Sequence, residues 1–266
     1  MPIIRARAPL QCLVAVRGHP FDRTAFDAMF QAMEGISATM VDQPAASQLM
    51  NHVSMRDYDV LVLYDMPGLD FEASEHAPLY YEPPAELVKG FAGLLAAGKG
   101  IVALHHALAG WPTWAEYHRW LGGQFFYHPA MWQGAPVPDS GYAHHVSYEA
   151  EVLAEHPVTA GLPAHFGMCD ELYLAEQDLE GATPLLRANT CFTRDDFYSA
   201  ALAVGGQMNA RDGWDHAPGS NIIAWAKQVQ ESRLVYIQPG DSGAAYDNPH
   251  YRRLVENAIR WSAQTA

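Results

Sequence analysis

The sequence predicts an α/β fold in which helices cover both faces of a mostly parallel, doubly wound sheet. Short apolar runs, typical of strands buried on both faces, recur at residues 10–16, 58–64 and 101–104. Segments with apolar residues at helical spacing separate these runs, and Gly or Pro marks most of the turns. Strands that alternate with helices in this way form right-handed βαβ units, so we expect the neighbouring strands to run parallel.

The first unit opens with a strand at residues 10–16, which breaks at the Arg-Gly-His-Pro sequence of residues 17–20. The helix that follows has Asp22 placed as its N-cap and Gly35 at its end. Residues 36–41 are a candidate second strand.

A stronger strand at residues 58–64 ends at Asp65 and runs into an acidic loop at residues 66–82. Two prolines then begin a helix over residues 83–98, and residues 101–104 form the next strand.

The pattern is less regular over residues 122–193, where we expect an insertion with antiparallel strands at 142–148 and 166–174. Residues 205–220 have no periodicity and predict a long loop. The last elements are strands at residues 221–225 and 234–238 and a helix capped by Asn248 and begun by Pro249.

The composition excludes several classes of protein. The 266 residues, 49% of them hydrophobic, can bury a large core, and we expect one elaborated domain over residues 1–266. A formal charge of -14 argues against nucleic acid and anionic membranes as partners. Three scattered cysteines, without a signal peptide or a membrane-length apolar stretch, predict a cytoplasmic protein.

Polar side chains follow three of the predicted parallel strands at their carboxyl ends. They are His19, Asp65 and the pair His105 and His106. Ligands of doubly wound sheets bind beyond these ends, so we expect the four side chains to converge on a site. Adjacent residues of an extended chain point to opposite sides, which predicts that only one histidine of the pair faces the ligand. An imidazole there could act as base, acid or metal ligand.

Two neighbouring carboxylates, Asp170 and Glu171, are the next acid–base candidates, and Tyr173 follows them. Buried carboxylates are costly unless they pair or bind something. We therefore assign Asp170 or Glu171 as the partner of the histidine, and Tyr173 as a substrate contact.

Three further residues are candidate substrate contacts. Trp111 follows the histidine pair and could stack on a ring of the ligand, and His128 follows a Gly-Gly and aromatic segment. His145 lies in a probable strand beside another histidine, where it could complete a site for a divalent cation such as zinc or manganese. No local metal-binding motif is present, so the sequence leaves open whether the site binds a cation. The other aromatic residues near Trp111 are expected in the core or at a homodimer face.

Seven motifs, in this order and spacing, resemble the ThuA-like (trehalose utilisation) family over nearly the whole chain. They are GHPF at 18–21, YDVLVLYD at 58–65, GKGIVALHHA at 98–107, LGGQFFYHP at 121–129, EHPVTAGL at 155–162, DELY at 170–173, and RLVYIQPGD followed by NPHYRRLVENAIRW at 233–261. The resemblance implies a flavodoxin-like three-layer α/β/α sandwich related to class I glutamine amidotransferases, and a link to oxidised or unusual sugars.

The chain departs from the related patterns at two places. Amidotransferases carry a nucleophilic cysteine after a central strand, where this chain has His105 and His106, so glutaminase chemistry is not expected. The family commonly has Gly-His near the C-terminus, where this chain has Gly240 and Asp241. The role of that histidine is therefore either absent or taken over by a carboxylate, and Asp241, like His19, is a candidate substrate contact that orients the ligand.

Two hypotheses follow from the sequence. The first is an enzyme of carbohydrate catabolism that acts on a sugar or keto-sugar by histidine and carboxylate acid–base chemistry, with hydrolysis, elimination and isomerisation all open and a metal possible in each. The second is a non-catalytic sugar-binding or accessory protein that kept the fold without the cysteine nucleophile.

Overall fold

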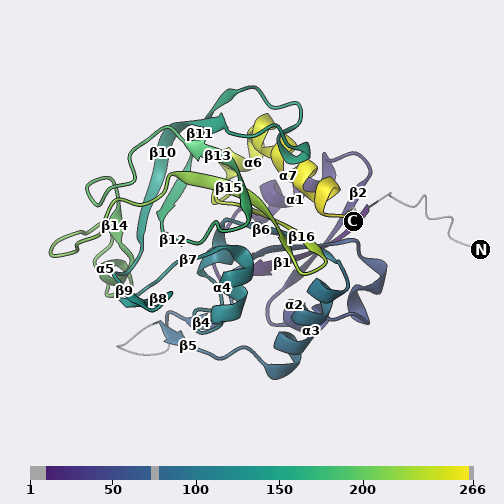
Figure 1. The fold of residues 1–266 in the computed structure, drawn as a ribbon, viewed down its shortest axis with the longest axis horizontal. Coiled ribbons are helices and arrows are strands. Elements are labelled where there is room, and N and C mark those ends of the chain that lie inside the picture. Colours follow the sequence, from purple (N-terminus) through teal and green to yellow (C-terminus); the bar gives the residue numbers. More distant parts are fainter. Residues whose placement is uncertain (1–9, 73–77, 264–266) are drawn as a thin grey trace, which may run out of the picture.

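The computed structural model describes residues 10–72 and 78–263, and its centre is one ten-stranded sheet (Figure 1). The strands of this sheet are β1 (Leu10–Arg17), β2 (Ile36–Asp42), β3 (Val60–Asp65), β6 (Gly100–Leu104), β10 (Gly141–Val152), β11 (His165–Leu174), β13 (Ala182–Ala188), β14 (Tyr198–Ser199), β15 (Ile222–Val229) and β16 (Ser232–Ile237). Short strands pair outside it as β4 (Leu69–Asp70) with β5 (Leu79–Tyr80), β7 (Gly123–Gln124) with β12 (Glu176–Gln177), and β8 (Ala130–Trp132) with β9 (Ala135–Val137).

The helices of the described ranges are α1 (Arg23–Gln31), α2 (Ala45–Leu49), α3 (Ala85–Ala96), α4 (Ala115–Leu121), α5 (Ala200–Val204), α6 (Gly243–Asp247) and α7 (Pro249–Ser262). Short 3-10 turns lie at η1 (Ser54–Asp57), η2 (His105–Ala109) and η3 (Pro157–Thr159). As predicted, Asp22 caps α1 and Asn248 caps α7, each by accepting hydrogen bonds from the first helical turn. Within the described ranges, no helix combines the length and apolarity needed to cross a bilayer.

The strand order of the main sheet is β11-β10-β13-β15-β16-β6-β3-β1-β2, with β14 paired to β10. The five strands from β16 to β2 are parallel, which confirms the predicted βαβ units. The other strands are antiparallel and come mainly from the region predicted as an irregular insertion. The insertion therefore extends the main sheet.

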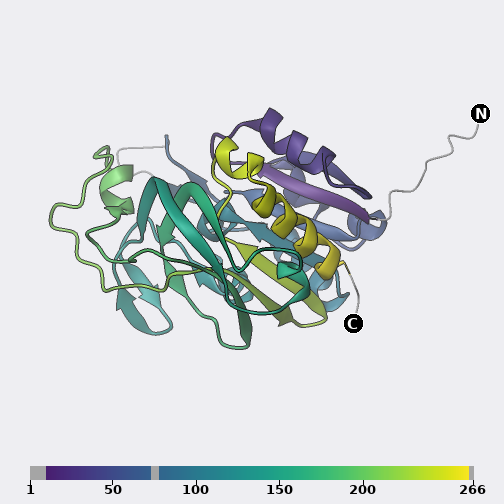
Figure 2. The ribbon, with the colours of Figure 1, turned by 90° about the horizontal axis from the view of Figure 1, so that it is seen from above.

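Helices cover both faces of the parallel half. Successive strand residues point to opposite sides of the sheet, so each strand packs against both helical layers. Val14 and Val62 pack in the core beneath α1 and α7, whereas Leu13 and Leu61 pack in the core with α2, α3 and α4. Figure 2 shows α1 and α7 lying together on one side of the sheet. The result is the three-layer α/β/α arrangement of the flavodoxin type.

The order in which successive strands are added to the sheet reverses at β1, since β2 pairs with one edge of β1 and β3 with the other. Such a switch point opens a crevice at the carboxyl ends of the two flanking strands. Gly18 follows β1 there with a φ of 106°, and a Cβ at this position would lie 2.3 Å from the carbonyl oxygen of Met66. Only glycine fits this contact without a backbone shift.

The antiparallel half curls back toward the same strand ends. Three strands separate β11 from β16 in the sheet order, yet the Gln238 side chain after β16 bonds to Tyr173 on β11. Its Oε1 accepts from the Tyr173 backbone N–H at 3.1 Å, and its Nε2 donates to the Tyr173 carbonyl at 3.3 Å. This curvature brings β11 side chains to the ends of the parallel strands.

Candidate active site

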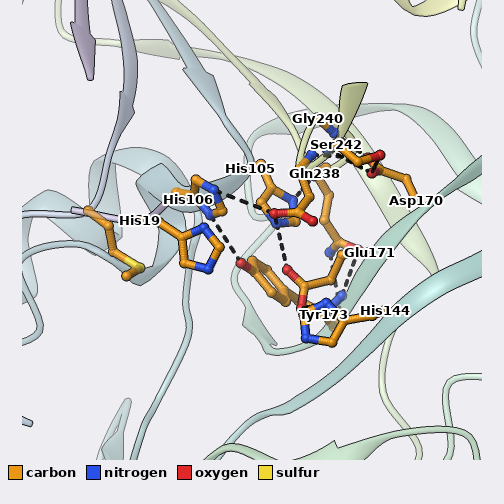
Figure 3. Close-up of polar contacts among 12 residues, drawn as sticks. His19, His105, His106, His144, Asp170, Glu171, Tyr173, Gln238, Gly240 and Ser242 are labelled. Atoms are coloured by element: carbon orange, nitrogen blue, oxygen red, sulfur yellow. Dashed lines mark hydrogen bonds and ion pairs between the residues drawn. The ribbon is translucent and has the colours of Figure 1, made fainter. Parts of the chain in front are cut away.

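Five side chains from four separate parts of the chain meet at these strand ends (Figure 3). His19 follows β1, His105 and His106 follow β6, Glu171 lies on β11 and Asp241 follows β16. His105 and His106 are almost completely buried, with 0% and 1% of their surfaces exposed. The topology thus places imidazoles and carboxylates together, as expected for most of the strand-end residues.

Both histidines of the adjacent pair face this cluster. The expectation that only one would do so is wrong, because the chain does not stay extended after β6. His105 has a φ of 33° and begins the 3-10 turn η2, so the two rings lie side by side with centroids 4.5 Å apart. The left-handed residue turns the second imidazole toward the site.

His105 lies between two oxygen atoms that can only accept hydrogen bonds. Its Nδ1 faces the backbone carbonyl of Gln238, and its Nε2 lies 2.9 Å from the Glu171 carboxylate. Burial disfavours the cation, but the hydrogen bond and charge of Glu171 outweigh burial and raise the pKa of His105 to about 9. The geometry therefore corresponds to an imidazolium.

Glu171 is the ionised partner of this imidazolium. Burial by itself raises the pKa of Glu171, but the His105 hydrogen bond and charge reverse the effect and hold it below the ordinary range. Its second oxygen lies 3.0 Å from Nδ1 of His144. The carboxylate thus bridges a fully buried imidazole and a half-exposed one.

His106 is the neutral member of the pair. Burial is the main cause that lowers its pKa well below 6.5, and the neighbouring His105 and His19 add to the effect. Its Nδ1 lies 3.4 Å from the Tyr173 hydroxyl. Its Nε2 is buried without a hydrogen-bond partner among the described residues and lies 3.6 Å from an Asp241 oxygen. A buried ring nitrogen without a partner calls for a ligand.

His19 lies against His106, with ring centroids 4.2 Å apart. Its Nδ1 is 2.9 Å from the carbonyl oxygen of Pro20, so Nδ1 carries the hydrogen and the lone pair is on Nε2. Burial lowers the pKa of His19, which favours this neutral form. A backbone carbonyl that fixes the tautomer is common behind metal-binding histidines.

Two sets of three side chains have ligand atoms within 4.8 Å of one another. One set is His19, His106 and Asp241, and the other is His105, Glu171 and Asp241. In the second set, Nε2 of His105 is already occupied, because it carries the proton of the ion pair with Glu171. The first has two neutral imidazoles and a carboxylate, a donor set that suits zinc or manganese.

Asp170 lies on the opposite face of β11 and does not join this cluster (Figure 3). Its carboxylate accepts hydrogen bonds from the backbone N–H groups of Gly240, Asp241 and Ser242, and from the Ser242 hydroxyl at 2.9 Å. Burial is the main influence on its pKa and raises it. Asp170 therefore anchors the loop that carries Asp241.

The sequence interpretation chose the wrong histidine on β10. A bulge between Ala143 and Val146 shifts the register, and His145, with a φ of 53°, is exposed. His144 takes the place beside Glu171 instead. The adjacent histidines were the signal, but only the bulge decides which of them faces inward.

A cavity of about 130 Å³ opens on this cluster. Its polar walls are His19, His144, Glu171 and the ring of Tyr173. The remaining walls are largely aromatic or aliphatic side chains, which suit the apolar surface of a small ligand. They include Phe71, Phe125, Tyr127, Tyr142 and Met208.

Three predicted substrate contacts lie outside this cavity. His128 is exposed, with Tyr80 as a ring neighbour, and Trp111 lines a different cavity. Asp65 is 2% exposed and accepts a hydrogen bond from Nε2 of Gln43. The strand-end rule placed Asp65 at the correct edge, but its side chain bonds to Gln43, which follows β2, and does not line the histidine cavity.

Comparisons with known proteins agree with this architecture. The chain matches the family model ThuA, described as trehalose utilisation, over residues 15–262. Its fold is similar to that of a ThuA-like protein from Parabacteroides merdae, with 15% identity, a TM-score of 0.64, and coverage of 96% of this chain and 90% of the other. No curated protein matches the chain.

Two other solved structures share the fold. A cytoplasmic protein from Salmonella typhimurium has 13% identity and a TM-score of 0.53, with coverage of 95% of this chain and 98% of the other. A glutamine amidotransferase from Thermotoga maritima has 8% identity and a TM-score of 0.50, with coverage of 97% and 99%. At these identities the likeness concerns the fold alone.

Proposed function

Because the chain belongs to the ThuA family, described as trehalose utilisation, we propose that it is an enzyme of carbohydrate catabolism that acts on a sugar or keto-sugar by acid–base chemistry. One observation carries the proposal. The unpartnered Nε2 of buried His106 lies beside His19 and Asp241, directly behind an aromatic cavity. A buried titratable group without a partner next to a cavity is a candidate catalytic group.

The residues around the cavity have different roles in this proposal. Glu171 is a carboxylate on the cavity wall that accepts hydrogen bonds from sugar hydroxyls, and His19 offers a neutral Nε2 that either transfers a proton or, with a cation present, serves as its ligand. His105 is a positioning residue, because its ion pair fixes Glu171 and its charge keeps neighbouring His106 neutral. Proton transfer at a sugar oxygen, or at the carbon beside a carbonyl, is shared by hydrolysis, elimination and isomerisation.

A divalent cation, zinc or manganese, fits the same residues. His19, His106 and Asp241 would hold it, and the orphaned Nε2 of His106 supports this assignment. When bound, such a cation supplies a Lewis acid for a sugar oxygen. Asp170 positions the Asp241 ligand through the loop that it anchors. A cytoplasmic location is part of the proposal and is supported by a structural relative described as a cytoplasmic protein.

The test combines metal content with turnover. The purified protein is analysed for bound metal and incubated with trehalose and its oxidised keto derivatives, and products are followed by NMR. We expect His106→Ala and Asp241→Asn to lose both the cation and the turnover, and His128→Ala, an exposed control outside the cluster, to keep them. A folded His106→Ala protein with parental turnover would sink the assignment of catalysis to this cluster, and a parent protein that turns over none of these sugars would sink the enzymatic proposal. Sugar binding without turnover in every protein would favour the non-catalytic alternative.

A further inference from the structure

A second and larger cavity, of about 650 Å³, lies at the carboxyl ends of β1 and β3. It is bordered by Arg17 at the end of β1, the Met66 loop after β3, and residues of α2 and of the first turn of α3. Its volume lies in the range of small-molecule sites, about 300–1,000 Å³. We propose that this cavity is a second binding site for a neutral sugar, separate from the histidine cluster.

A hydrogen-bonded backbone partition separates the two cavities. The Met66 N–H donates to the Arg17 carbonyl at 2.9 Å, and the Trp111 N–H donates to the Pro67 carbonyl at 2.6 Å. Gly18 closes the remaining gap through its backbone contact with Met66. Met66 borders both cavities, so the second cavity lies behind the wall of the first and a ligand there does not occupy the histidine site.

The walls combine apolar surface with dispersed polar groups. Met66, Leu87 and Trp111 provide the apolar part, and an indole offers a platform for the C–H face of a sugar ring. Arg17 carries a positive charge, Glu82 and Glu86 carry negative charges, and Gln43 adds an amide. Because carboxylates outnumber the one guanidinium, the lining repels a phosphate or a carboxylate and suits an uncharged polyhydroxylated ligand better.

Two energetically unfavourable features lie at this cavity, a strained backbone and a buried oxygen without a hydrogen-bond partner. Arg17 and Trp111 are non-glycine residues with φ angles of 92° and 47°, and both line it. Such strain clusters at ligand sites. Gln43 lines the cavity and donates to buried Asp65, whose other carboxylate oxygen has no partner among the described residues. Unsatisfied buried oxygens are rare and mark functional places.

The experiment counts bound sugars. Equilibrium dialysis with labelled trehalose and labelled glucose, up to about 10 mM, covers millimolar dissociation constants. Gln48 lies on α2, is exposed and lines the cavity, so Gln48→Trp fills it without disturbing the core. Gln31→Trp, an exposed position on α1 outside the cavity, is the matched control. Glu86→Trp on α3 fills the cavity from its other side.

We expect two bound sugars per chain in the parent and in Gln31→Trp, and one in Gln48→Trp and Glu86→Trp. His106→Ala tests the other site separately, because a loss of binding there leaves the second cavity intact. The proposal would be overturned if both cavity-filling variants bound as many sugars per chain as the parent. It would also be overturned if the parent bound no sugar whose binding is lost in these variants. Normal turnover in His106→Ala would remove only the catalytic role proposed for the histidine cluster and leave this inference standing.

Discussion

The Nε2 atom of His105 lies 2.9 Å from the Glu171 carboxylate, and both side chains are withdrawn from solvent. His105 also faces the Gln238 carbonyl, so the imidazole is doubly protonated. A buried ion pair adds little net stability, but removing one partner leaves the other charge uncompensated. The pair is therefore best tested by removing one side and then both.

Glu171→Gln is expected to lower the free energy of unfolding by about 3–5 kcal/mol, because it leaves the His105 imidazolium without its counter-charge. Urea denaturation at neutral pH measures the loss. The double variant His105→Gln/Glu171→Gln is expected to lose less than the sum of the two single variants, since the second substitution removes the unpaired charge.

His144→Ala is the control for the other contact of Glu171. The His144 side chain is 36% exposed, so its loss should cost less than about 1 kcal/mol. Additivity of the His105 and Glu171 substitutions within about 0.5 kcal/mol would contradict a coupled ion pair.

Asp170→Asn tests whether the loop of Asp241 depends on its anchor. The amide cannot accept all the bonds that the carboxylate accepts from residues 240–242. We expect cation affinity to fall about 10- to 100-fold, as for other residues that support metal ligands. Competition with a chelator of known affinity measures the change.

Ser242→Ala removes one hydroxyl from the same network and should have a smaller effect on cation affinity. A folded Asp170→Asn protein with parental affinity would show that the loop holds Asp241 without Asp170.

Most of the parallel half could be predicted from the sequence. Continuous apolar runs report strands buried on both faces, and Asp22 and Asn248 report helix starts through their side-chain bonds. The strand-end rule then locates His19 and His105 without any knowledge of their contacts.

The rest depended on backbone choices that residue patterns do not encode. His105 adopts a φ of 33°, which overrides the alternation expected of a strand. The bulge in β10 exchanges His144 for His145. Glu171 reaches the histidines because the antiparallel half curls back, and Trp111 is kept from them by the hydrogen-bonded partition. Long-range curvature is set by packing over the whole sheet.

Gly18→Ala tests the close approach behind His19. Gly18 combines a φ of 106° with backbone atoms of Met66 where a Cβ would lie. We expect a loss of unfolding free energy well above the roughly 1–2 kcal/mol of left-handed strain alone. Gly161→Ala isolates that strain, because Gly161 has a φ of 75° and no atom within 4 Å of its Cβ position. Equal losses in denaturation experiments would contradict the clash.

Asp65 makes stability depend on pH. Burial is the main cause that raises the pKa of its carboxyl from 3.8 to about 6, and the Gln43 hydrogen bond opposes it only in part. Between these two values the folded protein holds a proton that the unfolded chain has released. The contribution of Asp65 to the free energy of unfolding is therefore greatest in acid and falls as the pH rises from about 4 to above 6.

Asp65→Asn removes this titration. The unfolding free energy of the variant minus that of the parent is expected to rise by about 2–3 kcal/mol from pH 4 to pH 7, since one pKa unit is about 1.4 kcal/mol. The comparison with the parent at each pH cancels all other titrating groups. A flat Asp65→Asn profile in urea titrations would mean that the buried carboxyl is already ionised at pH 4, and that a cation or water satisfies its free oxygen.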